Sequence, residues 1–207
     1  AEPINGVIVS NLFQEGSRGV DEAWPLAEGA VHPPALRDMV ADLRLHPDEL
    51  TPADLVLFLP HIGRLPQSDP RIATLRRQVA QCASVHNVAT ALLEKEKWDF
   101  AAIFYDLIDV AGHHFMQFHP PRMAHVNDAD FAAYSDVMRG VYRFHDMMLD
   151  RLMQIVGEDT TVIIASDHGF YSDHLRPQGT GFTEAAAADA AWHRPLGIVA
   201  MRGPGLK

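Results

Sequence analysis

The run of residues 160–170, TTVIIASDHGF, constrains the fold of this chain more than any other stretch. An apolar, β-branched segment ends there at Asp167 and His168, and Gly169 follows. Continuous apolar runs of this kind are typical of strands buried in α/β sheets, which bind ligands beyond the carboxyl ends of their strands. We therefore expect a carboxylate and an imidazole side by side at a sheet edge, which is half of the ligand set of a cation site.

A second run, residues 99–114, has the same pattern of an apolar segment followed by an Asp and a His. The apolar segment 100–105 leads into Asp109 and His113, which are spaced by four residues. If the chain is helical after Asp109, the two side chains lie on one helix face and can share a metal ion. Gly112 lets the backbone turn tightly beside them. Two such runs in one chain are a far stronger signal of a metal site than one.

The order of the segments predicts how the two motifs come together. An apolar stripe over 131–155, preceded by Asn127 and followed by Gly157, predicts a long helix between strands at 100–105 and 160–165. A strand, a helix and a strand over this distance imply a parallel pair joined by a crossover helix. We therefore expect an α/β fold with a mostly parallel central sheet flanked by helices, and both motifs at one sheet edge.

Two further segments bear on the layout. Asp69 and Pro70 are typical of a helix start, and apolar residues at helical spacing continue the pattern to Leu93. Residues 172–191 contain glycines and a run of alanines, which predict a loop or flap. The chain therefore alternates helical and extended segments, as α/β proteins do.

Composition excludes some partners. The chain has 207 residues, of which 47% are hydrophobic and 21% charged, so it can bury a core of ordinary size. It contains no apolar run of about 18 residues or more, so we expect no membrane-spanning segment. Its net charge of −10 and the lack of a basic stripe argue against binding to a nucleic-acid polymer. A small phosphate substrate stays compatible with this charge, because bound cations would reverse the local field.

The motifs Asp-x-x-Gly-His at 109–113 and Ser-Asp-His-Gly-Phe at 166–170 resemble those of the alkaline phosphatase superfamily, in particular its type I phosphodiesterase/nucleotide pyrophosphatase branch. The resemblance implies an alkaline-phosphatase-like fold with two divalent metal ions at the carboxyl edge of a central sheet. It also implies a metal-dependent hydrolase of phosphate esters or anhydrides. Nitrogen and oxygen ligands without a thiolate suit zinc or manganese.

The resemblance also implies a role for each ligand. Asp109 and His113 would hold the first ion together with a later histidine, which is best matched by His193 before the apolar segment 196–201. Asp167 and His168 would hold the second ion, together with an upstream Asp and a Thr or Ser nucleophile. Two ions placed in this way would clamp the attacking and leaving oxygens of an in-line displacement at phosphorus.

No residue of this chain matches the nucleophile or the upstream Asp of the family. The chain opens without a Met, and its end at 203–207 resembles the point before the last helix of the family. We therefore expect an incomplete, central part of the catalytic domain, with no catalytic residue assigned in it and little turnover by it alone. Residues 11–70 are expected to form a helical or irregular insertion or cap.

The sequence does not decide the roles of two more histidines, and it leaves several functions open. His114 and His119 are candidates for substrate binding, although packing or surface roles are equally compatible with the sequence. The alternatives to a phosphodiesterase are a phosphomutase or phosphonate hydrolase of the same superfamily, or a metal-binding domain without catalysis. The sequence leaves open the exact substrate, the oligomeric state and the compartment.

Overall fold

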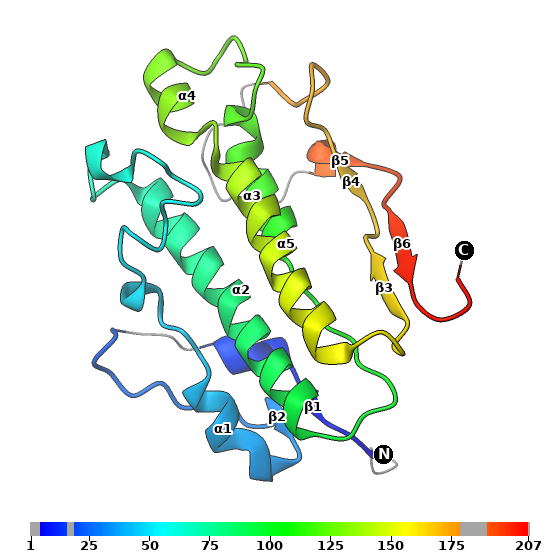
Figure 1. Cartoon of the computed structure of the whole chain (residues 1–207). Helices are drawn as coiled ribbons and strands as arrows, with labels where there is room; N and C mark the ends of the chain where they lie inside the picture. Colours follow the sequence, from blue (N-terminus) through cyan, green and yellow to red (C-terminus); the bar gives the residue numbers. More distant parts are fainter. Residues whose placement is uncertain (1–4, 16–18, 179–189, 207) are drawn as a thin grey trace. The chain divides into compact units, whose positions relative to one another are not determined.

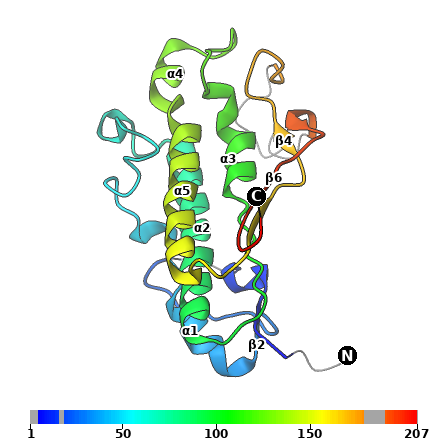
Figure 2. The ribbon, with the colours of Figure 1, turned by 45° about the vertical axis from the view of Figure 1, so that its right-hand side comes forward.

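The computed structural model describes residues 5–15, 19–178 and 190–206 of the chain. They divide into two compact units, and Figures 1 and 2 draw the ribbon of the chain coloured along the sequence. The first unit comprises Ala1–Thr51 and Ala73–Tyr105, and the second comprises Pro52–Ile72 and Asp106–Lys207. The expected insertion over 11–70 holds only short elements and is divided between the two units, so its role as an insertion stays a prediction.

The first unit is built around one long helix and a short antiparallel pair. Strand β1 (Ile8–Val9) pairs with β2 (Val31–His32), and the short helix α1 (Arg37–Asp42) follows. Helix α2 (Pro70–Lys95) confirms the helix predicted from Pro70. The buried centre of the unit consists of Phe13, Ala30, Val31, Val40 and Val88. Most of α2 thus belongs to the first unit, while its first residues belong to the second.

The second unit carries both metal motifs and is mainly helical. Helices α3 (Leu107–Phe115) and α5 (Val137–Val156) run side by side (Figure 1). Gly140 of α5 lies against the backbone of 57–58, and a Cβ there would stand 2.6 Å from the carbonyl oxygen of Leu57. The 3₁₀ helix η5 (Met116–Phe118) continues α3.

The long helix predicted between the motifs is interrupted. Helix α4 (Asp128–Tyr134) is separated from α5 by Ser135 and Asp136. The start and end signals predicted for the long helix are both confirmed. The side chain of Asn127 accepts a hydrogen bond from the backbone N–H of Asp130 at 2.8 Å, and Gly157 ends α5 with a φ of 71°.

The strand pairs of the second unit are antiparallel. Strand β3 (Val162–Ala165) pairs with β6 (Val199–Arg202), and β4 (Gly169–Phe170) pairs with β5 (His193–Arg194). Residues 100–105 form no strand ladder. The expected mostly parallel central sheet is therefore not formed among the described residues. An apolar run indicates that a segment suits a sheet, but it does not specify the partner strand.

Two other predictions concern membranes and the loop after β4. None of the helices in the described part of the chain is long and apolar enough to cross a membrane. Of the loop predicted over 172–191, residues 172–178 and 190–191 are described, and 179–189 lie outside the described residues. The 3₁₀ helix η6 (Ala190–Trp192) leads from this loop into β5.

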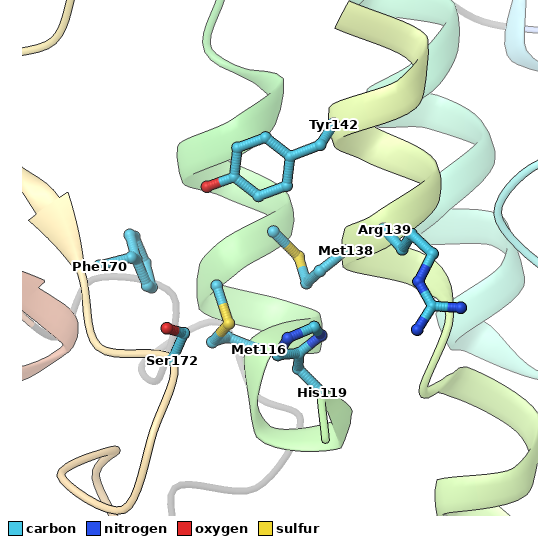
Figure 3. A pocket seen from close by; sticks show the side chains of 7 residues that line it. All are labelled: Met116, His119, Met138, Arg139, Tyr142, Phe170 and Ser172. Carbon is cyan, nitrogen blue, oxygen red and sulfur yellow. The ribbon is translucent and has the colours of Figure 1, made fainter. Parts of the chain in front are cut away.

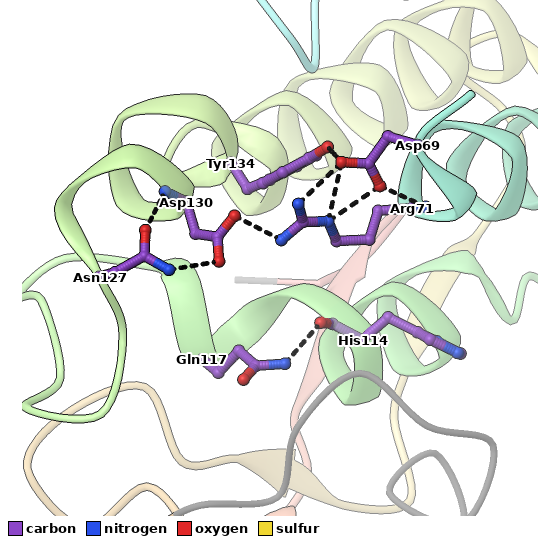
Figure 4. A network of polar contacts seen from close by, with 7 residues as sticks. All are labelled: Asp69, Arg71, His114, Gln117, Asn127, Asp130 and Tyr134. Carbon is purple, nitrogen blue, oxygen red and sulfur yellow. Dashed lines mark hydrogen bonds and ion pairs between the residues drawn. The ribbon is translucent and has the colours of Figure 1, made fainter. Parts of the chain in front are cut away.

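A polar network fixes α4 to the start of α2 within the second unit (Figure 4). The guanidinium of Arg71 donates to Asp69 Oδ2 at 2.7 Å and to Asp130 Oδ1 at 2.7 Å. The hydroxyl of Tyr134 donates to Asp69 Oδ2 at 2.8 Å. These bonds lower the pKa of the Asp69 carboxyl to about 2, with the hydrogen bond from Arg71 as the largest cause.

This network predicts a loss of stability in acid. Because the pKa of Asp69 is depressed by folding, its contribution is complete above about pH 4 and is lost as the pH falls towards about 2. Relative to Asp69→Asn, the natural chain should therefore lose on the order of 2 kcal/mol more free energy of unfolding between pH 6 and pH 2. Urea titrations at both pH values measure this difference.

The control for the acid experiment is Asp128→Asn, since the side chain of Asp128 is 93% exposed. It should retain the pH dependence of the natural chain. If Asp69→Asn retained that dependence as well, the ion pair with Arg71 would contribute nothing to stability.

Candidate metal centre

Helix α3 delivers the first two predicted ligands. The chain is helical from Leu107, so Asp109 and His113 stand one turn apart on the same face, as their spacing predicted. Asp109 Oδ1 lies 3.5 Å from His113 Nε2. The His113 side chain is only 5% exposed, so α3 presents this imidazole in a nearly dry environment.

The strand pairs deliver two more histidines. His168 stands between β3 and β4, and His193 is the first residue of β5. The β4–β5 pairing places Phe170 opposite His193, and the rings of His168 and His193 stack with centroids 3.7 Å apart. His168 Nδ1 lies 3.2 Å from the carbonyl oxygen of Gly169. A proton on Nδ1 satisfies that contact and leaves the lone pair on Nε2 free for a metal ion.

The three imidazoles converge on one carboxylate oxygen. Asp109 Oδ1 lies 3.2 Å from His193 Nε2, 3.5 Å from His113 Nε2 and 3.6 Å from His168 Nε2. The Nε2 atoms of His113 and His193 are 2.9 Å apart. Asp109 Oδ1 is buried and has no hydrogen-bond partner among the described residues.

These separations fit the ligand shell of a metal ion. Bonds of 2.0–2.2 Å in tetrahedral geometry, as around zinc, place the ligand atoms roughly 3.3–3.6 Å from one another. The distances from Asp109 Oδ1 to the three nitrogens, 3.2–3.6 Å, match that separation. The donor set of one carboxylate and neutral imidazoles also suits zinc and other borderline ions. Asp109, His168 and His193 in particular offer ligand atoms within 4.8 Å of one another.

Asp167, the fifth predicted ligand, lies at the exposed edge of this cluster. Its side chain is 90% exposed, and its Oδ1 lies 3.8 Å from His168 Nε2. The same oxygen accepts a hydrogen bond from the backbone N–H of His168 at 3.1 Å. The structure therefore brings four of the five predicted ligands together and leaves Asp167 at the rim.

Burial favours the neutral form of His113. Its pKa lies below the usual histidine value, chiefly because burial penalises the charged ring, and the neighbouring His193 and His168 lower it further. The carboxylate of Asp109 opposes this shift. A neutral imidazole is the form that binds a metal ion, so this environment prepares His113 as a ligand.

An aromatic wall, which was not predicted from the sequence, holds the imidazoles in place. The ring of Phe170 contacts those of His113 and His193 edge-on, with centroids 5.1 Å and 5.4 Å away. Phe170 also stacks on Trp192, which is fully buried. A Cβ on Gly112 would stand 2.9 Å from the Phe170 ring, so the glycine of the first motif makes room for the phenylalanine of the second.

The two candidate substrate histidines lie outside the cluster. His114 Nδ1 is 2.8 Å from the carbonyl oxygen of Val110 in its own helix. His119 lines a cavity of about 320 Å³ (Figure 3). The other lining residues are Met116, Met138, Arg139, Tyr142, Phe170 and Ser172. Phe170 therefore borders both the cavity and the metal cluster, while a substrate role for either histidine stays a prediction.

Arg176 is a second residue that the sequence did not reveal. It is 3% exposed, and its guanidinium donates to the carbonyl oxygens of Met116 at 2.9 Å, His119 and Pro121. Its Nε donates to the carbonyl oxygen of Asp173 at 2.8 Å. It thereby ties the segment after β4 to the end of α3, beside the cavity.

Removal of the Arg176 side chain should destabilise this region strongly. Arg176→Ala leaves several buried carbonyl oxygens without donors, which should lower the free energy of unfolding by about 3 kcal/mol. The midpoint of urea unfolding measures the loss. Arg143→Ala, on the exposed face of α5, is the matched control and should change the midpoint little. Equal midpoints for the two variants would contradict the anchoring role.

The cluster of imidazoles around Asp109 is a candidate metal site, and comparison with protein families identifies the family to which the chain belongs. The family model for type I phosphodiesterase / nucleotide pyrophosphatase matches residues 6–194. The chain belongs to this family. The match includes all five predicted metal ligands. Comparisons with curated proteins and with solved structures gave no match.

Proposed function

We propose that this chain supplies the metal-binding part of a hydrolase that cleaves phosphate esters or anhydrides. The observation that carries the proposal is the convergence of three imidazole nitrogens on the buried oxygen of Asp109, at separations that suit a shared ion. Membership of the family supplies the class of reaction. Small phosphate diesters and nucleotide anhydrides are the substrates we expect.

The residues around the cluster have separable roles in this proposal. When bound, zinc or manganese would polarise the phosphoryl oxygens and stabilise the charge that develops on them. Asp109 contributes the negative charge that favours a dication, and the histidines contribute neutral nitrogen donors. Phe170 and Trp192 exclude water from one side of the imidazoles.

The active enzyme is proposed to use two divalent ions. Asp109, His113 and His193 are assigned to the first, and Asp167 and His168 contribute to the second. The attacking hydroxyl is assigned to a Thr or Ser for which residues 1–207 contain no matching motif, so this chain alone should show little turnover. The exposed position of Asp167 is compatible with a second site that needs further ligands.

The cavity beside Phe170 is proposed to accept the organic group of the ester. Met116, Met138 and Phe170 give it an apolar lining, while His119 and Arg139 provide polar atoms. Burial lowers the pKa of His119, with Arg176 and Arg139 adding to the effect, which favours its neutral, hydrogen-bonding form. Residues 11–70 are the other segment to which we assign substrate choice.

The test is hydrolysis of bis(p-nitrophenyl) phosphate by the protein expressed from its complete coding sequence. We expect hydrolysis that is abolished by a chelator and restored by zinc or manganese, and a loss of at least about a hundredfold in Asp109→Ala. The chain of 207 residues should stay near the background rate. Hydrolysis that is insensitive to both the chelator and Asp109→Ala would contradict the proposed function, and robust turnover by the chain alone would contradict the placement of the nucleophile.

A further inference from the structure

The cavity beside Phe170 has a lining that discriminates between the organic groups of possible esters. We propose that it selects a single uncharged aromatic ring, so that small aryl esters are preferred over esters of nucleosides and of quaternary ammonium alcohols. Tyr142 is the residue that determines this specificity. The inference rests on the proposed function for the presence of a phosphate ester, and it deepens that function by naming the class of alcohol. The residues that line the cavity all belong to the second unit.

Contacts outside the cavity fix part of its lining. The ring of Phe170 stacks on the buried ring of Trp192, with centroids 6.2 Å apart. The buried guanidinium of Arg176 donates to the carbonyl oxygens of Met116 and His119. Because this part of the lining is held before a ligand binds, less freedom is lost on binding. Phe170 also contacts two imidazoles of the metal cluster, so an ester whose phosphoryl group lies at the cluster can place its organic group against this lining.

The side chains of the lining favour an aromatic ring. Phe170 and Tyr142 each offer an aromatic face or edge, and aromatic pairs attract one another beyond the effect of the area they bury. Met116 and Met138 are buried, and thioether sulfurs make favourable contacts with aromatic rings. Figure 3 shows these four side chains gathered about one space. An alkyl group of equal size would fill the space without the ring-specific contacts.

The size and charge of the cavity narrow the class of alcohol further. Its volume of about 320 Å³ lies at the lower end of the range for ligand pockets, roughly 300–1,000 Å³. A single substituted ring suits this space better than a nucleoside, which adds a sugar to its base. The guanidinium of Arg139 lines the cavity and disfavours a cationic alcohol. The same guanidinium pairs with Asp136 at 3.0 Å, so it does not require an anion from the ligand.

Tyr142 is the lining residue through which this preference can be tested. It is 53% exposed on α5, so its removal leaves the core of the unit in place. Met138 is buried in that core, and Phe170 supports the metal cluster, so substitutions there would mix several effects. Tyr142→Ala removes one aromatic contact with a bound ring, whereas Tyr142→Phe keeps it.

The experiment is a titration of the chain of 207 residues with 4-fluorophenol, followed by ¹⁹F NMR. We expect saturable binding that Tyr142→Ala weakens at least about threefold and that Tyr142→Phe retains. Met147→Ala is the matched control, because this residue is exposed on the same helix and lies outside the lining. As competitors, cyclohexanol, choline and thymidine should each displace the probe at least about threefold less effectively than phenol. Urea midpoints of the variants exclude unfolding as the cause.

A kinetic measurement links the cavity to the ester. For the protein expressed from its complete coding sequence, Tyr142→Ala should raise KM for bis(p-nitrophenyl) phosphate at least about threefold with little change in kcat. This split is expected because the ring is bound equally in the ground state and in the transition state. A loss of folded protein would lower the apparent kcat and leave KM unchanged.

Three results would overturn the preference for a ring and leave the proposed function standing. They are metal-dependent hydrolysis without binding of 4-fluorophenol, affinity and KM that are unchanged in Tyr142→Ala, and displacement by cyclohexanol or thymidine as effective as by phenol. Binding of the ring as expected, but without metal-dependent hydrolysis by the complete protein, would support the ring site and contradict the proposed function.

Discussion

Replacing Asp109 by asparagine should remove tight zinc binding from this chain. Asp109 Oδ1 lies within 3.6 Å of the Nε2 atoms of His113, His168 and His193, so it is the common neighbour of the three histidines proposed as ligands. The amide keeps the shape of the side chain but removes the negative charge that attracts a dication. Loss of supporting groups around metal ligands costs about 10- to 100-fold in affinity, so loss of this direct ligand should cost at least about 100-fold.

A competition titration with a chromophoric chelator measures this loss. Asp159→Asn, an exposed acidic residue just before β3, is the control for the change in net charge and should bind zinc as the natural chain does. Asp109→Asn should also abolish the increase in melting temperature that zinc gives the natural chain, since a ligand stabilises only the state that binds it. Unchanged zinc affinity in Asp109→Asn would show that the ion binds elsewhere.

The second large effect is expected at Gly197, which lies between β5 and β6. A Cβ there would stand 1.8 Å from the carbonyl oxygen of Ser166 and 2.6 Å from its carbonyl carbon. Gly197→Ala therefore forces two backbone segments apart and breaks the 2.9 Å hydrogen bond from Ser166 N–H to the carbonyl oxygen of Ile198. Overpacking usually costs about 1–3 kcal/mol, and a clash between two backbones should reach about 3 kcal/mol.

This substitution should also impair metal binding, because the displaced segment leads directly into His168. Urea midpoints and zinc affinity measured on the same preparation separate the two effects. Gly63→Ala is the matched control, since a Cβ on Gly63 meets no atom within 4 Å and its φ is not positive. If Gly197→Ala had the urea midpoint and the zinc affinity of the natural chain, the two segments would not be in close contact.

Features that depend on local spacing were predictable from the sequence. The four-residue spacing of Asp109 and His113 predicted a shared helix face, and α3 provides it. Asn127 and Gly157 marked the start of α4 and the end of α5 because the preferences for helix caps act within one turn. The helix from Pro70 was predictable from apolar periodicity, because that pattern also depends only on residues three or four positions apart.

Features that depend on distant partners were not predictable. The segment 100–105 has the composition of a strand, yet Phe100 and Phe104 are 83% and 81% exposed and no ladder forms there. Arg176 gave no signal because its acceptors are backbone carbonyls 55 to 60 residues earlier in the chain. The break between α4 and α5 at Ser135 and Asp136 was also missed, since the apolar stripe runs through it.

The same contrast between local and distant signals applies to the candidate site. Adjacency in sequence predicted that Asp167 and His168 act as a pair, and their side chains approach to 3.8 Å, but the two differ in exposure. His168 is one-quarter exposed and faces Asp109, whereas Asp167 is 90% exposed. Residue type and position thus indicated which side chains could bind a metal, and only the arrangement of the strands indicated which of them meet.

The most direct test of the metal centre is X-ray absorption spectroscopy at the zinc edge, on the chain loaded with one equivalent of zinc. The extended fine structure reports the number of imidazole rings bound to the ion. The assignment of Asp109, His113 and His193 to the first ion predicts two imidazoles, with oxygen donors in the remaining positions. A spectrum with oxygen donors only, and without scattering from imidazole rings, would contradict the metal centre.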